Sequence, residues 1–159
     1  MWSAGRRKLL ENGSRAPDFR LELLDGGAVT LPEILAGGLA LLAFFKISCP
    51  VCQLTFPFLE RIHQAGALRI FGVSQNDAED TRDFCREFGV TIPVLLDSED
   101  AGFQASNEYG IVSVPTLFLV GADGVIARVT EGWRKQEMAA LGGPGLFRQG
   151  ENVPEWKAG

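Results

Sequence analysis

The sequence predicts an α/β protein in which helices cover both faces of a central sheet, giving a three-layer α/β/α sandwich. Two observations support this fold class. From residue 39 to residue 120, apolar runs of strand length alternate with segments of helical periodicity. A β-hairpin pattern precedes this alternation, and a second hairpin with a closing helix follows it. The chain has 159 residues, 46% of them hydrophobic, which is enough for one domain with its own core.

The first part of the chain predicts a hairpin. Residues 1–16 are polar, and we expect little regular structure there apart from a short helix near residues 7–11. From Phe19, apolar and polar positions alternate on both sides of an Asp-Gly-Gly turn at residues 25–27, which is typical of a β-hairpin. A short helical turn is expected at residues 32–36, where two glycines then end it.

The next segment is a buried strand that leads directly into a helix. Residues 39–45, Leu-Ala-Leu-Leu-Ala-Phe-Phe, are continuously apolar, as expected for a strand covered on both faces. Apolar residues then recur at helical spacing, which predicts a helix over about residues 50–65. Pro50 suits the first helical turn, because its missing N–H would have no partner there.

A Cys-x-x-Cys motif stands at the junction of this strand and helix. Cys49 takes the N-cap position, where free backbone N–H groups and the helix dipole favour a thiolate. Cys52 lies one turn further along, close enough to form a disulfide with Cys49. A chain of this size needs no disulfide framework to fold, so its three cysteines are not expected to be structural. The motif instead indicates a dithiol redox centre.

The remaining segments continue the alternation of strands and helices. Strands are expected at residues 68–74, 92–97, 114–120 and 125–130, and helices at about residues 77–88, 101–109 and 134–141. A Gly-Ala-Asp-Gly turn at residues 121–124 predicts that the last two strands form an antiparallel pair. Residues 142–159 form a tail rich in glycine and proline, which we expect to pack over a sheet edge. We therefore expect one domain over residues 1–159, with its core at about residues 16–141.

The charge of the chain excludes two classes of partner. The formal net charge is −5, which argues against binding to nucleic acid or to an anionic membrane surface. No apolar run reaches the 18 or so residues of a membrane span. Residues 1–14 lack the apolar segment of a signal peptide, so we expect a cytoplasmic protein, or a periplasmic or other extracytoplasmic one if a leader has been removed. We expect a monomer.

Seven sequence markers occur in one order along the chain. They are Ala16-Pro17-Asp18-Phe19, Phe44 to Cys52, Pro57, Pro93-Val94-Leu95-Leu96-Asp97, Tyr109-Gly110, Val114-Pro115-Thr116 and Gly121-Ala122-Asp123-Gly124. In this ordered set the chain resembles the thioredoxin superfamily, and within it the TlpA/ResA-like thiol-disulfide oxidoreductases, which share ancestry with the AhpC/TSA peroxiredoxins. The resemblance covers about residues 16–141. It implies a thioredoxin-like fold with an N-terminal β-hairpin and a central insert.

The resemblance implies thiol–disulfide exchange through a redox-active Cys49–Cys52 disulfide. Cys49 would attack a substrate disulfide as a thiolate, and the more buried Cys52 would then resolve the mixed disulfide. The expected partners are protein thiols or disulfides and an upstream reductase or oxidant, with no further cofactor and no metal. The pair Pro50-Val51 between the cysteines supplies neither a histidine nor a charge, so we expect an intermediate or reducing potential.

The resemblance also implies a substrate site beside the dithiol. Pro115 stands where these proteins carry a cis-proline, and a cis bond is accessible before proline. Because proline has no N–H of its own to pair, the backbone of Val114 is left free to bond an extended substrate strand. The expected substrate-binding residues are Val114, Pro115, Pro50 and Val51.

Three positions depart from the family pattern. Thioredoxins carry a buried acid six residues before the first cysteine, where this chain has Ala43. ResA-like proteins carry a glutamate three residues after the second cysteine, where this chain has Thr55. Ser48 replaces the tryptophan common just before the first cysteine. The usual proton acceptor for the second cysteine is thus missing, and water, Lys46 or a carboxylate from elsewhere would have to take its place.

A thiol peroxidase is the first alternative, with an antioxidant activity carried by Cys52. Peroxiredoxins use one cysteine in a Pro-x-x-x-Thr/Ser-x-x-Cys pattern. Aligning Cys52 with that cysteine places Phe45 on the proline and Cys49 on the hydroxyl residue, so both signature residues are lost. Arg128 or Arg134 could supply the arginine that stabilises a peroxidatic thiolate, although no motif marks either of them.

A non-enzymatic role is the second alternative, in which Cys49 and Cys52 form a passive disulfide or half of a metal site. A four-ligand zinc site needs two more ligands, for which the chain offers only Cys85 and His63. Cys85 lies in an expected amphipathic helix and fits a partly buried free thiol. His63 lies beside charged and polar neighbours and fits a surface position.

Overall fold

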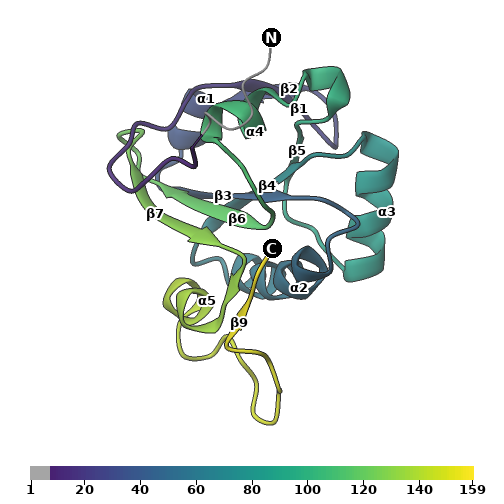
Figure 1. The fold of residues 1–159 in the computed structure, drawn as a ribbon, viewed down its shortest axis with the longest axis vertical. Coiled ribbons are helices and arrows are strands. Elements are labelled where there is room, and N and C mark those ends of the chain that lie inside the picture. The colour runs from purple at the N-terminus through teal and green to yellow at the C-terminus, as the bar shows by residue number, and fades with distance from the viewer. Residues whose placement is uncertain (1–7) are drawn as a thin grey trace.

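Within residues 8–159, the part of the chain that the computed structural model describes, seven strands form a mixed sheet with helices on both faces (Figure 1). The strands lie in the order β2-β1-β5-β4-β3-β6-β7. Their bounds are β1 Arg20–Leu23, β2 Ala28–Thr30, β3 Ala40–Phe45, β4 Arg69–Ser74, β5 Val94–Leu96, β6 Thr116–Val120 and β7 Ile126–Glu131. The helices are α1 Leu31–Leu35, α2 Pro50–Ala65, α3 Ala78–Phe88, α4 Gln104–Tyr109 and α5 Lys135–Gly142, with a 3-10 turn at Glu99–Ala101.

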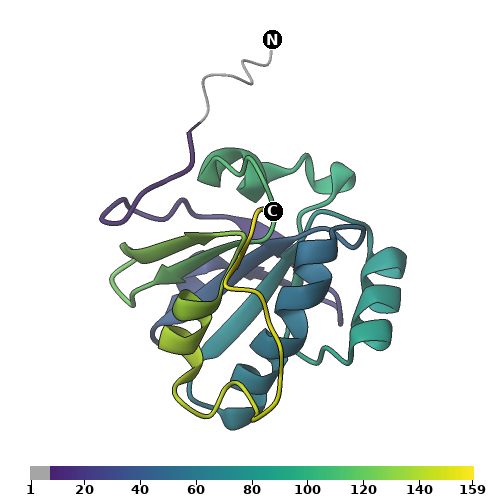
Figure 2. The same ribbon diagram turned by 60° about the horizontal axis from the view of Figure 1, so that its bottom comes forward.

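The three layers follow from how the strands are connected. Strands β3, β4 and β5 are parallel neighbours, joined by α2 and then by α3. Because such crossovers share one hand, both helices lie on the same face of the sheet, and α5 joins them there (Figure 2). Helices α1 and α4 cover the opposite face (Figure 1). The predicted three-layer α/β/α fold is confirmed.

Strand β3 is buried on both faces, as its continuous apolar sequence predicts. Successive side chains of a strand point to opposite faces. Phe44 therefore packs toward α4, with its ring centroid 5.3 Å from that of Tyr109. Phe45 points the other way, 4.2 Å from the ring of Phe56 on α2 and 5.0 Å from that of Phe84 on α3. These aromatic contacts fix α2 on the sheet at the point where β3 ends.

The neighbour of β3 on its other side is β6, which runs antiparallel to it. Phe44, near the end of β3, is paired with Thr116 at the start of β6. The loop before β6 must therefore lie beside the junction of β3 and α2. The expected central insert, marked by residues 93–97 and 109–110, corresponds to β5 and the end of α4, and β5 lies between β4 and β1 in the sheet.

The expected elements agree with the structure to within about three residues, with one exception. The helix expected near residues 7–11 is wrong for residues 8–11, which have no helical structure, and residue 7 lies outside the described part. The backbone there bonds to distant segments instead. Leu10 N–H donates to the carbonyl of Tyr109 at 3.2 Å, and Gly13 N–H donates to that of Ile126 at 2.8 Å.

The tail lies against α2 rather than over an edge of the main sheet (Figure 2). The ring of Phe147 lies 5.3 Å from that of Phe58 on α2 and 6.1 Å from that of Trp133. The tail then forms a short strand, β9 (Trp156–Lys157), which pairs with β8 (Trp133–Arg134). Aromatic burial on α2 is the physical reason for this course. Across residues 8–159, every helix is too short or too polar to cross a membrane.

Candidate active site

The dithiol lies where β3 passes into α2. Cys49 is the N-cap of α2, with an extended backbone at φ −83° and ψ 115°, and Pro50 takes the first helical turn. The N–H of Cys52 donates to the Sγ of Cys49 at 3.2 Å, so the first cysteine caps the helix with its sulfur. The amide of Gln53 holds the preceding loop by donating to the carbonyl of Ile47 at 3.0 Å. Local sequence therefore sets the position of Cys49.

The two thiols have different environments. Cys49 is half-buried, whereas Cys52 is fully buried. Burial raises the pKa of the Cys52 thiol far above its ordinary value, and a hydrogen bond with the Cys49 side chain raises it further. The backbone and the charge of Lys46 act in the opposite direction on this pKa but do not outweigh burial. Cys52 is therefore a thiol at neutral pH and must lose a proton before it can act as a nucleophile.

The substrate-binding residues expected from the sequence gather around Cys49. The peptide bond between Val114 and Pro115 is cis, as expected. The thiol of Cys49 donates to the carbonyl oxygen of Val114 at 3.3 Å, across 65 residues of sequence. Between the cysteines, Pro50 is exposed and Val51 is half-buried. The antiparallel pairing of β3 with β6 brings these two segments together.

The positions that carry acids in related proteins offer no proton acceptor here. Ala43 is fully buried within β3. Thr55 is also fully buried, and its hydroxyl donates to the carbonyl of Val51 at 2.7 Å. Ser48 is exposed. Lys46, at the end of β3, is the side chain whose charge favours the thiolate of Cys52.

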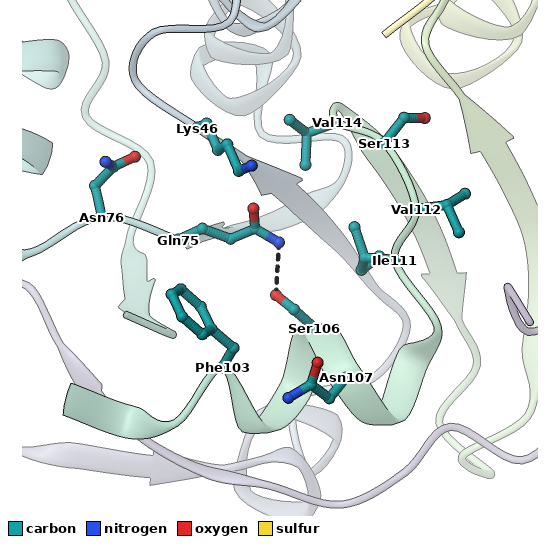
Figure 3. A pocket seen from close by; sticks show the side chains of 10 residues that line it. All are labelled: Lys46, Gln75, Asn76, Phe103, Ser106, Asn107, Ile111, Val112, Ser113 and Val114. Carbon is teal, nitrogen blue, oxygen red and sulfur yellow. Dashed lines mark hydrogen bonds between the residues drawn. The ribbon is translucent and has the colours of Figure 1, made fainter. Parts of the chain in front are cut away.

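A cavity of about 320 Å³ opens on the side of Val114 where Lys46 lies (Figure 3). It is lined by Lys46, Gln75, Asn76, Phe103, Ser106, Asn107, Ile111, Val112, Ser113 and Val114. The amide of Gln75 donates to the hydroxyl of Ser106 at 2.8 Å across its floor. Phe103, in the left-handed backbone region at φ 49°, and Val112, which is 69% exposed, form an apolar rim. Sequence reasoning missed this rim, although two large apolar residues in turns were a signal.

The groups required by the alternative functions lie apart from the dithiol. Cys85 is on α3, where burial and then the charges of Asp25 and Glu60 raise the pKa of its thiol to about 11. His63 is in the last turn of α2. In the described range 8–159, no group of three or more His, Cys, Asp or Glu side chains could hold a metal ion. Neither cysteine of the motif is in a disulfide, and both are free thiols.

The arginines proposed for a peroxidase site have other surroundings. Arg128 on β7 forms an ion pair with Glu137 at 3.7 Å. Arg134 is exposed on β8. The charged side chain that influences the pKa of Cys52 is Lys46.

Comparison with known proteins identifies the family. The family model described as "AhpC/TSA family" matches residues 12–129, which is most of the chain. The chain belongs to the AhpC/TSA family. It is 29% identical to the thiol-disulfide oxidoreductase ResA of Halalkalibacterium halodurans over 83% of this chain and 75% of that protein. It is 30% identical to the thioredoxin-like protein YneN of Bacillus subtilis over 81% of this chain and 77% of that protein.

Solved structures agree with these relatives. A putative thiol:disulfide interchange protein DsbE from Chlorobium tepidum superposes with a TM-score of 0.70 at 26% identity, covering 83% of this chain and 93% of that one. A putative protein disulfide isomerase from Bacteroides thetaiotaomicron superposes with a TM-score of 0.73 at 29% identity, covering 85% and 87%. The comparisons confirm the thioredoxin-like fold, the relation to ResA-like proteins and the predicted class of activity, thiol–disulfide oxidoreduction.

Proposed function

We propose that this AhpC/TSA-family protein exchanges electrons with protein disulfides, with Cys49 as the nucleophile and Cys52 as the resolving thiol. The observation that carries the proposal is the asymmetry of the two thiols. Cys49 is accessible and sits at the start of a helix, whereas Cys52 is fully buried behind it. An accessible thiol at a helix N-terminus can meet a substrate, and the buried one can meet only its partner.

The exchange proceeds in two thiol–disulfide substitution steps. The thiolate of Cys49 attacks one sulfur of the substrate disulfide, and the other substrate sulfur leaves as a thiolate. Cys52, once deprotonated, attacks the Sγ of Cys49 and releases the second substrate thiol. The substrate gains two electrons, and the protein is left with the Cys49–Cys52 disulfide. An upstream dithiol reductase restores the reduced form, and an oxidant would drive the same steps in reverse.

Removing the proton from Cys52 is the difficult part of the second step. Ala43 and Thr55 cannot accept it, because neither side chain is a base. Lys46 lowers the cost of the thiolate through its positive charge, against the effect of burial. Lys46 thus favours the thiolate of Cys52 through its charge, and we expect water or a carboxylate from elsewhere to accept the proton.

The substrate docks as an extended segment beside Val114 and Pro115, with Pro50 and Val51 forming the opposite side of the contact. The hydrogen bond from the Cys49 thiol to the carbonyl of Val114 supports this docking mode, because it places the Val114 backbone beside the reactive sulfur. Backbone bonding to an extended segment gives affinity that does not depend on the side chains of the substrate.

A peroxidase that uses Cys52 has less support from the geometry. Cys52 is fully buried, and burial raises the pKa of its thiol, whereas a peroxidatic cysteine must be an accessible thiolate. A single unit spanning residues 1–159 and a monomeric state remain predictions. The cytoplasmic location expected from the sequence also remains a prediction, without support from the relatives.

Selective alkylation tests the assignment of roles. The reduced protein is treated briefly with limiting iodoacetamide at mildly acidic pH, and the labelled peptides are identified by mass spectrometry. We expect label at Cys49, with Cys52 and Cys85 protected because burial raises the pKa of both thiols. A Cys49→Ser variant is the control and should lose most of the label. Preferential labelling of Cys52 in the unaltered protein would overturn the assignment.

A further inference from the structure

The tail that follows α5 returns to the dithiol after being anchored on α2. Phe147 packs against Phe58 and Trp133. The indole N–H of Trp133 donates to the carbonyl of Pro154 at 2.6 Å. From there the chain pairs with β8 and runs on toward the end of the sheet where β3 meets α2 (Figure 2). Residues 156–159, called the strap below, form this last part.

The strap lies directly against the backbone of the expected substrate site. A Cβ atom placed on Gly159 would overlap the carbonyl oxygen of Val114 and approach the nitrogen of Pro115 to 3.3 Å. A Cβ atom placed on Gly132 would overlap the carbonyl oxygen of Lys157 and approach the nitrogen of Gly159 to 3.2 Å. The strap backbone therefore fills the space between Gly132 and the Val114–Pro115 loop. Glycine at positions 132 and 159 makes this close approach possible.

The carbonyl that the strap covers is also part of the dithiol site. Val114 O accepts the hydrogen bond from the Cys49 thiol at 3.3 Å. A substrate segment that bonds to Val114 needs the same space beside the same carbonyl. The strap and a docked substrate segment cannot both occupy it.

We infer that the strap occupies the substrate site when no substrate is bound and competes with substrate for it. The substrate is an extended polypeptide segment that replaces the strap on the β8 edge. This inference rests on the proposed function. The close approach at Gly159 also restricts which substrate residue can take its place. The residue that takes the place of Gly159 must be small, because the carbonyl of Val114 leaves no room for a Cβ in that position.

The strap can open without unfolding the tail that holds it. Its pairing with β8 consists of two residue pairs, and all four of its residues are exposed, Trp156 by 54%. The part before it is held more firmly. Leu146 is buried, and the guanidinium of Arg61 donates to both carboxylate oxygens of Glu151. Segments with few buried contacts open at low free energy while anchored ones stay closed.

Substitutions at Lys157 can distinguish the backbone pairing of the strap from the contribution of its side-chain charge. Lys135 N–H donates to the carbonyl of Glu155 at 3.0 Å. Because hydrogen-bonded pairs alternate in an antiparallel ladder, Trp133 and Lys157, two residues along, also form a hydrogen-bonded pair. Lys157→Pro removes the strand N–H at this pair, whereas Lys157→Ala removes the same charge and keeps the N–H.

The test compares these two variants with the unaltered protein. Each reduced protein reacts with insulin, whose disulfides are the probe, in a single turnover, and alkylation of Cys49 by iodoacetamide reports access for a small reagent. If the strap is open in about a tenth of the molecules, Lys157→Pro should react with insulin about ten-fold faster. Lys157→Ala should match the unaltered protein. Gly159→Val, which pushes the strap away from Val114, is a second variant expected to match Lys157→Pro.

The outcomes separate the two proposals. Equal or slower reaction of Lys157→Pro and Gly159→Val with insulin, while the unaltered protein reduces it, would overturn the strap and leave the dithiol function standing. An increase that Lys157→Ala shares would also overturn the strap, because it would assign the effect to the lost charge. If none of the proteins reduces insulin, the proposed function fails and the inference falls with it.

Discussion

Lys46 is the charged side chain that acts on the buried thiol of Cys52, and its removal should slow the resolving step. The positive charge opposes the effect of burial on the pKa of Cys52. Lys46→Met keeps much of the length of the side chain and removes the charge. The thiolate of Cys52 then forms less readily, and the mixed disulfide on Cys49 persists longer.

The size of this effect follows from the exposure of Lys46. Its side chain is exposed at the end of β3, so water screens the interaction. Ion pairs at the protein surface are worth about 0.2–1 kcal/mol, and screening at the exposed end of Lys46 brings its interaction with the buried Cys52 thiolate into this range. Since 1.36 kcal/mol corresponds to one pKa unit, and so to a factor of ten in the thiolate population, we expect the resolving step to slow by about 1.5-fold to five-fold.

An aromatic disulfide reagent, 5,5′-dithiobis(2-nitrobenzoate), separates the two steps. The attack of Cys49 releases the first coloured thiolate, and the attack of Cys52 on the mixed disulfide releases the second. The second phase should be slower in Lys46→Met and close to normal in Lys46→Arg. It should accelerate with rising pH in all three proteins, because burial raises the pKa of Cys52. A second phase that is unchanged in Lys46→Met would refute the role of this charge.

Three further predictions address the roles of the thiols and the anchoring of the tail. Cys52→Ala should accumulate a mixed disulfide with insulin that gel electrophoresis without reductant detects, whereas a protein that lacks Cys49 should form none. Phe58→Ala should lower the free energy of unfolding in urea by about 3–5 kcal/mol, because Phe58 is buried between aromatic rings; a loss below about 1 kcal/mol would contradict this packing. Hydrogen bonds from the Arg61 side chain, and then from the Arg148 backbone, lower the pKa of Glu151 to about 2. The ionised Glu151 therefore stabilises the fold fully above about pH 4.3, the ordinary pKa of glutamate, and this stabilisation is lost as the pH falls toward 2. Glu151→Gln should therefore weaken the decline of stability over that pH range, as urea midpoints would report, and an unchanged decline would exclude this ion pair as its source.

The sequence by itself determined the elements and the dithiol. Residues 39–45 form a strand because every side chain in the run is apolar, and the strand is buried on both faces as expected. Cys49 becomes an N-cap because Pro50 and the helical spacing that follows start a helix at the next residue. These signals act over a few residues, so they can be recognised without knowing the rest of the fold. The family resemblance also predicted the cis bond before Pro115, which the structure contains.

Only the tertiary structure decided what surrounds the dithiol. Val114 meets Cys49 because β6 lies antiparallel beside β3, and the order of strands in a sheet depends on how the whole chain packs. The course of residues 142–159 differs from the expected packing over a sheet edge, since a Gly- and Pro-rich tail has no periodicity that predicts a partner. Its anchors are Trp133 and, much earlier in the chain, Phe58, and they direct the strap toward the carbonyl of Val114. Local sequence therefore placed the reactive sulfur, and long-range packing placed the groups that control access to it.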